Sequence, residues 1–138
     1  MFPRYKKLKW LAYHDSLTGL LNRNWLYENM HTITQGYVYF IDINNLKEVN
    51  KKGHTQGDKH IQKIIQKIES YLDHPDDILI RYAGDEFILF TNAHYLETCA
   101  LYSVGYSEIF SGIGIKHAII EADSNMITNK GKYKNKKL

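Results

Sequence analysis

The stretch Ile78–Thr91, which reads ILIRYAGDEFILFT, is the part of the chain from which the fold is best read. Two apolar runs rich in β-branched and aromatic residues, Ile78–Tyr82 and Phe87–Phe90, flank a short polar centre with one glycine. This pattern predicts a β-hairpin. The turn also carries two adjacent carboxylates, Asp85 and Glu86, although a connecting turn needs neither. Taken alone, the two acids are explained by ordinary turn and strand-end roles.

A second acidic segment makes the pair informative. Residues 36–44, GYVYFIDIN, form an apolar run that ends in Asp42 and Asn44, which is typical of a central strand covered by helices. Side chains two positions apart share a face of a strand, so Asp42 and Asn44 are expected to point the same way. If this strand lies beside the hairpin, Asp42 and Glu86 meet at one end of the sheet. Two carboxylates there would suit Mg²⁺ and leave room for substrate phosphates.

The remaining segments predict helices around this sheet. The clearest helix covers 58–72, because five apolar residues recur at the spacing of one face, after a polar connection closed by Gly53 and Gly57. Asn22 is placed to cap an earlier helix that runs to about residue 32. A short N-terminal helix over 4–13 would place Leu8, Leu11 and Ala12 on one face, and a last helix over 116–130 would turn inward Ala118, Ile119, Ala122, Met126 and Ile127.

With a further strand at 101–109, this order predicts an α+β fold of the ferredoxin-like or palm type, with a mostly antiparallel sheet flanked by helices. The 138 residues are expected to form a single domain, 1–138, with a solvated basic tail from about residue 131. We expect a cytoplasmic protein, because no signal peptide or membrane-length apolar run is present and Cys99 is the one cysteine. We expect neither a nucleic acid nor a membrane partner.

Four stretches together resemble the ordered motifs of the GGDEF domain family, the diguanylate cyclases. They are DSLTGLLNR at 15–23, DINNLKEVNKKGHTQGD at 42–58, RYAGDEF at 81–87 and ADSNMITNKGKYKN at 122–135. The resemblance spans nearly the whole chain. It implies a palm-like domain in which two GTP-loaded copies meet face to face, as a homodimer. Each 3′-hydroxyl then attacks the α-phosphate of the other GTP, which gives cyclic di-GMP and pyrophosphate.

The resemblance also implies a metal site. Asp42 and Glu86 would ligate two Mg²⁺ or Mn²⁺ ions per active site, with help from the carbonyl of Ile43. Asp85 and Glu86 would be the catalytic residues, and Glu86 would assist deprotonation of the 3′-hydroxyl. Asp42 has the weakest alternative explanation, because an acid that ends a buried strand is costly without a partner.

Further positions would bind the nucleotide. Asn50 and Asp58 would read the guanine edge, where a carboxylate accepts from the N–H donors of the base. Leu17 would pack near the base. Asp58 also stands where the cap of the next helix is predicted, and for that position alone capping is the simpler role. Asn50 is equally explained as an ordinary loop residue.

The phosphates would be held at the other end of the substrate. Gly84 would let the backbone approach the α-phosphate, where a side chain would collide with the substrate. Lys130 and Lys134 would hold the β- and γ-phosphates. Lys134 replaces the arginine that is usual in the family, so a bidentate fork becomes a point charge. Both lysines also belong to a lysine-rich end, for which solvation is the default explanation.

The chain departs from the family pattern in several places. Ala83 replaces the first glycine of the signature, and Asn44 replaces the second acid of the first acidic motif. Where many members carry an RxxD product-inhibition site, the residues are His74 and Asp77, so we predict no feedback inhibition of that kind. Only residues 92–100 separate the hairpin from the next strand, where the family has a full helix. The sheet face left uncovered would be buried by the N-terminal helix or by another subunit.

The sequence leaves three functional interpretations. The first is a stand-alone, metal-dependent diguanylate cyclase that is slow unless two copies associate. The second is a degenerate GGDEF module that binds GTP or a partner protein without turnover, which the shortened scaffold favours. The third is a related palm enzyme that makes another nucleotide product. A guanine reader at Asp58 argues against the third.

Overall fold

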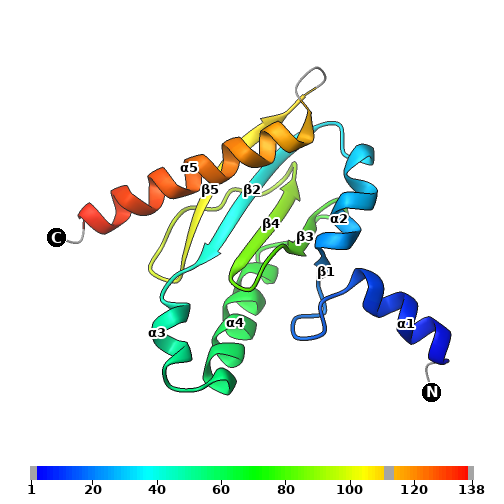
Figure 1. Ribbon diagram of the computed structural model, residues 1–138. Coiled ribbons are helices and arrows are strands. Elements are labelled where there is room, and N and C mark those ends of the chain that lie inside the picture. The colour runs from blue at the N-terminus through cyan, green and yellow to red at the C-terminus, as the bar shows by residue number, and fades with distance from the viewer. Residues whose placement is uncertain (1–2, 111–113, 137–138) are drawn as a thin grey trace.

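The chain folds around one five-stranded sheet, which a computed structural model describes for residues 3–110 and 114–136 (Figure 1). The strand order is β1-β3-β4-β2-β5, and every pair is antiparallel except β1 and β3. The predicted α+β class is therefore confirmed. The elements are α1 (Arg4–Tyr13), β1 (Leu21–Asn22), α2 (Arg23–Asn29), the 3₁₀ helix η1 (Met30–Thr32), β2 (Gly36–Ile43), α3 (Leu46–Asn50), α4 (His54–Glu69), β3 (Ile78–Arg81), β4 (Glu86–Thr91), β5 (Tyr102–Ile109) and α5 (Ile115–Lys136).

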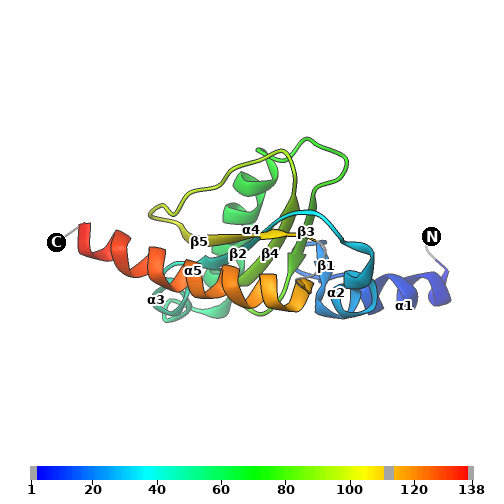
Figure 2. The ribbon, with the colours of Figure 1, turned by 90° about the horizontal axis from the view of Figure 1, so that it is seen from above.

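Helices cover both faces of the sheet, so its central strands are buried on both sides. Figure 2 shows α4 on one side of the sheet and α2 with α5 on the other. Along β2, Tyr39 and Ile41 belong to the core under α4, whereas Val38 and Phe40 belong to the core under α2 and α5. This alternation follows from the period of two along a strand. It explains why the sequence of β2 reads as a continuous apolar run.

The helix boundaries agree only partly with the predictions. Asn22 caps α2 as predicted, because its Oδ1 accepts a hydrogen bond of 3.0 Å from the Trp25 N–H. The chain breaks before α4 at Gly53, where φ is +123°, so α4 begins at His54 and takes in both Gly57 and Asp58. The prediction that Asp58 caps this helix, and that Gly57 closes the preceding loop, was therefore wrong. The predicted apolar face is confirmed by the buried residues Ile61, Ile64, Ile65 and Ile68.

The terminal helices differ from the expectations in what they bury. Helix α1 forms over the predicted residues but buries none of them, and Leu8 is 61% exposed. Helix α5 continues through Lys136, so the predicted tail from about residue 131 is helical, although most of its side chains are exposed. The inward position of Ile127 was wrong, because Ile127 is 61% exposed. Its predicted companions Ala118, Ala122 and Met126 are buried, and Ile119 is partly buried.

Residues 92–101 contain no helix, as predicted, and this segment itself covers the sheet beside α4. Leu96 is buried in the core under α4. The segment is fastened by Asn44, whose side-chain amide donates to the carbonyls of Cys99 (3.1 Å) and Ala100 (3.3 Å). Helix α1 does not contribute, because it lies on the other side with α2. The sequence predicted that α1 or a second subunit would bury this face of the sheet, but the segment 92–101 covers it instead.

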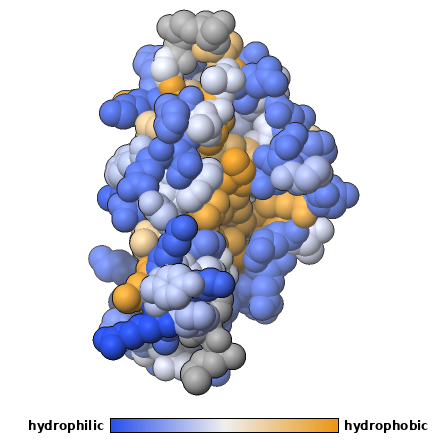
Figure 3. All heavy atoms as spheres, turned by 90° about the vertical axis from the view of Figure 1, so that its right-hand side faces the viewer, coloured by the Kyte–Doolittle hydropathy of each residue, from blue (hydrophilic) through white to orange (hydrophobic). Residues whose placement is uncertain are grey.

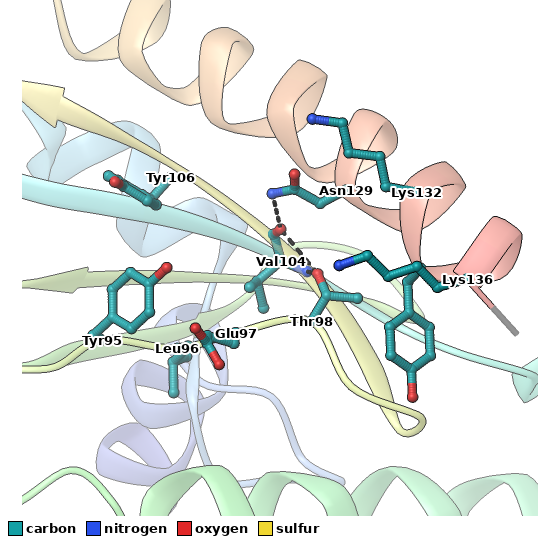
Figure 4. A pocket seen from close by; sticks show the side chains of 10 residues that line it. Tyr95, Leu96, Glu97, Thr98, Val104, Tyr106, Asn129, Lys132 and Lys136 are labelled. Atoms are coloured by element: carbon teal, nitrogen blue, oxygen red, sulfur yellow. Dashed lines mark hydrogen bonds between the residues drawn. The ribbon is translucent and has the colours of Figure 1, made fainter.

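The outer edge of β5 is closed by side chains, as Figure 4 shows. The Val104 carbonyl accepts from the Asn129 side-chain amide (3.0 Å), and the Val104 N–H donates to the Thr98 hydroxyl (3.0 Å). One turn earlier on α5, the Asn125 side chain donates to the Tyr106 carbonyl (3.0 Å). A cleft of about 330 Å³ lies beside this edge, and its lining includes none of the residues predicted for the functional site. Edge groups that are capped in this way cannot pair with another strand.

The opposite edge of the sheet is only partly covered. Strand β1, which the sequence did not predict, pairs with the last two residues of β3. Figure 3 shows a hollow with hydrophobic atoms on this side of the molecule, where a cleft of about 340 Å³ is lined in part by Leu72, Ile78 and Asp77. Asp77 is engaged inside the chain, because its carboxylate accepts 2.7 Å from Thr91 Oγ1 and pairs at 2.8 Å with His94. The absence of RxxD-type feedback inhibition stays a prediction.

Candidate active site

The two acids singled out in the sequence lie directly opposite each other. Asp42 on β2 and Glu86 on β4 are register partners at one end of the sheet. On each strand the acid continues the row of side chains that faces α2 and α5, namely Val38 and Phe40 on β2 and Ile88 and Phe90 on β4. Side chains on directly opposite positions of an antiparallel pair are close enough to share a ligand. The predicted convergence of Asp42 and Glu86 is therefore present in the fold.

Helix α5 brings a lysine onto this acid pair. Lys130 Nζ lies 2.7 Å from Asp42 Oδ2, and both side chains are partly buried. Lys134 lies one turn further along the same helix and is exposed. The two lysines predicted to hold phosphates therefore stand in line on α5, with the first directly over the end of β2.

The turn between β3 and β4 presents an open backbone. A Cβ added at Gly84 would meet no heavy atom within 4 Å, so space is available where a substrate phosphate is predicted to approach. Neither Ala83 nor Gly84 has a positive φ, which explains why alanine is accommodated at position 83. The turn is held from outside by Arg81, which donates to the Gly84 carbonyl (2.9 Å) and pairs with Asp15 (3.0 Å). The turn that carries Asp85 and Glu86 is thereby tied to the N-terminal segment.

The carboxylates of the site repel one another. Burial raises the pKa of Asp85, and the charge of Asp42 raises it further. Burial also raises the pKa of Glu86, with added repulsion from Asp85, Asp123 and Asp42. The pKa of Asp123 on α5 is raised by burial and by Asp42. Such a group of acids is stabilised by a cation between them.

Two residues at this site were missed by the sequence reasoning. Arg23 at the start of α2 donates from Nε to the Tyr82 carbonyl (2.9 Å), and its guanidinium lies 4.1 Å from the centre of the Tyr82 ring. Its positive charge offsets part of the rise in the pKa of Glu86. Asp123 faces Asp42 and Glu86 from α5. Both lie inside the quoted stretches 15–23 and 122–135, so the motifs contained the signal although no role was assigned to these positions.

The residues predicted to bind guanine gather around the first two turns of α4. The Asn50 side chain lies against Gly57, so closely that a Cβ there would be 1.7 Å from Asn50 Oδ1. Asp58 follows Gly57 and is exposed. The Leu17 carbonyl accepts 3.1 Å from the side chain of Gln62, one turn after Asp58. All three predicted positions therefore approach the same part of one helix, although the residue roles remain predictions.

The donor set suits a hard cation only in combination with a substrate. Among residues 3–110 and 114–136, no group of three or more His, Cys, Asp or Glu side chains could hold a metal ion by itself. Two carboxylates and the nearby main chain of Ile43, whose N–H donates to the Asp85 carbonyl (2.9 Å), supply fewer oxygens than Mg²⁺ requires. Nucleotide phosphates and water would complete the shell, which is how Mg²⁺ is commonly bound in nucleotide enzymes. The residues present therefore fit the expected ion.

Comparison with protein families shows that residues 12–103 match the family described as "Diguanylate cyclase, GGDEF domain". Cyclic di-GMP phosphodiesterase PdeR of Escherichia coli K12 is 39% identical over an alignment of 92 residues, which covers 61% of this chain and 14% of that protein. Diguanylate cyclase DgcP of the same organism is 32% identical over an alignment of 87 residues, which covers 56% of this chain and 25% of that protein. The matches therefore span at most a quarter of these curated relatives.

Solved structures agree with the fold. The structure of diguanylate cyclase SiaD with its activator SiaC, from Pseudomonas aeruginosa, superposes with a TM-score of 0.77. The superposition covers 91% of this chain and 61% of that chain, at 24% identity.

Among the residues that the structure describes, no helix is long and apolar enough to cross a membrane.

Proposed function

This chain belongs to the GGDEF domain family, and on that premise we propose that it is a diguanylate cyclase that condenses two GTP molecules to cyclic di-GMP with release of two pyrophosphates. The observation that carries the proposal is the pairing of Asp42 with Glu86 across β2 and β4, with Lys130 above it. A nucleotidyl transfer needs acids that share a metal cation, a basic side chain for the phosphates and a backbone that the α-phosphate can approach. The acid pair, Lys130 and the open turn would supply these three parts.

In the proposed reaction each residue mainly positions its substrate. Asn50 and Asp58 hold the guanine edge beside Leu17, while Lys130 and Lys134 hold the β- and γ-phosphates. The open backbone at Gly84 admits the α-phosphate. Two Mg²⁺ ions at Asp42, Glu86 and the Ile43 carbonyl would supply charge neutralisation and Lewis acidity when bound.

The bond change takes place between two copies of the domain. The 3′-oxygen of one GTP attacks the α-phosphorus of the other, the P–O bond to the pyrophosphate breaks, and Glu86 assists removal of the 3′ proton, with Asp85 beside it. The same exchange in the opposite direction closes the ring. Catalysis therefore needs a homodimer, at least transiently, and the rate per molecule should rise with protein concentration.

The proposal is tested with GTP, ATP and their mixture in the presence of Mg²⁺ or Mn²⁺, with products identified by mass spectrometry. We expect cyclic di-GMP from GTP alone, at a rate that rises faster than linearly with protein concentration. Glu86→Gln is expected to reduce the rate by at least about 100-fold, because several kcal/mol of charge stabilisation are lost. Folded protein at high concentration that releases no pyrophosphate would reject the cyclase.

The same experiment separates the competing interpretations. Calorimetry that finds tight GTP binding without pyrophosphate release would select a binding module. A product from ATP would select the third interpretation, a palm enzyme that makes another nucleotide.

A further inference from the structure

A partly buried basic group of the site, Lys130, is paired with the acid that is expected to bind the metal. Lys130 Nζ lies 2.7 Å from Asp42 Oδ2, with 32% of the lysine side chain and 14% of the aspartate side chain exposed. The contact joins α5 to β2, which lie far apart in the sequence, so it depends on the packed fold. The ammonium group thus stands at a carboxylate oxygen that a divalent cation would use.

An ammonium ion and a divalent cation cannot both contact the same carboxylate oxygen from the same side. Each needs direct contact with the oxygen, and their like charges repel. Lys130 must therefore leave Asp42, at least in part, before a cation can bind there. Leaving is costly for a partly buried ammonium without a new partner. The phosphates of a nucleotide are such a partner, and Lys130 lies on the helix that is expected to meet them.

Lys134 provides an internal comparison. It is also predicted to hold phosphate and lies one turn further along α5, but it is exposed and forms no ion pair with the residues that the structure describes. If both lysines only held phosphate, their removal would have similar effects. The contact with Asp42 gives Lys130 a second effect that Lys134 lacks.

We propose that Lys130 is a positioning residue that makes divalent-cation binding at Asp42 conditional on a bound nucleotide. In the free protein the ammonium group takes the place of the cation. When a nucleotide binds, its phosphates draw Lys130 away and Asp42 becomes free for the metal. The inference rests on the proposed function, because it takes the site to be one for a nucleotide with its metal.

Thermodynamic linkage makes the effect reciprocal. If the nucleotide increases the affinity for the cation by displacing Lys130, the cation must increase the affinity for the nucleotide by the same factor. Removing the lysine side chain should reduce this coupling from both directions. It should also allow the cation to bind the free protein more tightly, which loss of a structural contact alone would not do.

The test is a Mn²⁺ titration followed by electron paramagnetic resonance, with and without a non-hydrolysable GTP analogue. In Lys130→Met without nucleotide we expect Mn²⁺ to bind about tenfold more tightly than in the natural protein, within the usual range of coupling between two ligands. The variant should bind the nucleotide more weakly, and the nucleotide should improve its Mn²⁺ affinity less. Lys134→Met should weaken nucleotide binding and leave the Mn²⁺ affinity of the free protein unchanged.

Two further variants keep the test decisive. Lys130→Arg preserves the charge next to Asp42 and should keep the weak Mn²⁺ affinity of the free protein, so it serves if Lys130→Met fails to fold. Asp42→Asn should remove the tight Mn²⁺ site in either background.

Unchanged or weaker Mn²⁺ binding by folded Lys130→Met, or tight binding by Lys130→Arg, would overturn the proposal. No measurement depends on turnover. Protein that makes cyclic di-GMP without this Mn²⁺ pattern rejects only the inference, and the pattern without product rejects only the cyclase.

Discussion

At the scale of single residues, the carboxylates at the end of the sheet lower the stability of the folded protein at neutral pH. The pKa of Glu86 is raised by burial and then by repulsion from Asp85, Asp123 and Asp42. A carboxyl with a raised pKa binds its proton more tightly in the folded state than in the unfolded state. The free energy of unfolding therefore falls as pH rises from the ordinary range of a glutamate through the raised pKa, and it stays lower above that range.

Glu86→Gln should consequently make the nucleotide-free protein more stable at neutral pH, although it is expected to reduce the rate of the proposed reaction. Because Glu86 is only partly buried, we expect the melting temperature to rise by no more than about 3 °C. The difference should vanish in thermal melts below the ordinary pKa range of glutamate, where both side chains are neutral. Glu108→Gln, at an exposed position of β5, is the control and should change neither melt. A lower melting temperature for Glu86→Gln at pH 7 would contradict this account.

Asn44 gives a second prediction at this scale. Its amide N–H₂ donates to the carbonyls of Cys99 and Ala100, and its Oδ1 accepts 2.8 Å from Ser103 Oγ. A carboxylate has no N–H to donate, so Asn44→Asp would set negative oxygens against two carbonyls. We expect a loss of about 1–3 kcal/mol in the free energy of unfolding, measured by urea denaturation. Asn45→Asp, next to it and exposed, should have little effect.

The sequence revealed which residues meet but not what each one touches. The convergence of Asp42 and Glu86 followed from strand periodicity and from a hairpin that carries acids, which are local signals. The partner of Asn44 lies more than 50 residues away in a segment without periodicity. For the same reason the sequence assigned no role to the amide that replaces an acid at position 44, whereas the structure shows that this amide fastens the 92–101 segment.

At the scale of elements, α3 and α4 form a unit in which a glycine makes room for a predicted guanine reader. A Cβ at Gly57 would be 1.7 Å from Asn50 Oδ1, so Gly57→Ala must push the Asn50 side chain aside. The moved atoms are the end of a flexible side chain, and alanine favours a helix over glycine by about 1 kcal/mol. We therefore expect thermal stability to be unchanged or slightly higher, while GTP affinity measured by calorimetry falls about tenfold, or about 1.4 kcal/mol.

Gly131→Ala is the matched control, because Gly131 also lies inside a helix and an added Cβ there meets nothing within 4 Å. It should stabilise the protein without changing GTP affinity. Equal affinity for GTP in both variants would show that Asn50 does not read the base.

Long periodic elements were predictable and short or context-dependent ones were not. The 78–91 hairpin and the apolar face of α4 were found because each repeats a clear spacing. Strand β1 was missed, since two residues carry no period and form a strand only through pairing with β3. The start of α4 was misplaced because a positive φ at Gly53, which no sequence pattern reveals, sets the break. The helical end of α5 was missed because lysine and asparagine also suit a solvated tail.

At the scale of the whole molecule, the packed body begins after α1. No residue of α1 is buried, and its contacts with the body are few, such as the Ala12 carbonyl that accepts 3.1 Å from Asn22. Removal of residues 1–13 should therefore leave a folded domain whose melting temperature falls by only about 1–4 °C. Circular dichroism melts of the shortened chain check this.

Asp15→Ala in the full chain is the informative contrast. It keeps α1 but leaves partly buried Arg81 without its carboxylate partner, so it should lower the free energy of unfolding by about 1–3 kcal/mol. If the shortened chain lost more stability than Asp15→Ala, the body would not begin where the structure places it.

The capped edge of β5 restricts how copies of this protein can assemble. With the Val104 and Tyr106 carbonyls already engaged by Asn129 and Asn125, one sheet cannot simply continue into the sheet of a neighbour. Two molecules are thus steered away from endless, fibre-like stacking along their strands. The end of the sheet that carries Asp42 and Glu86 lies apart from this edge, so the proposed encounter of two copies does not depend on pairing between their strands.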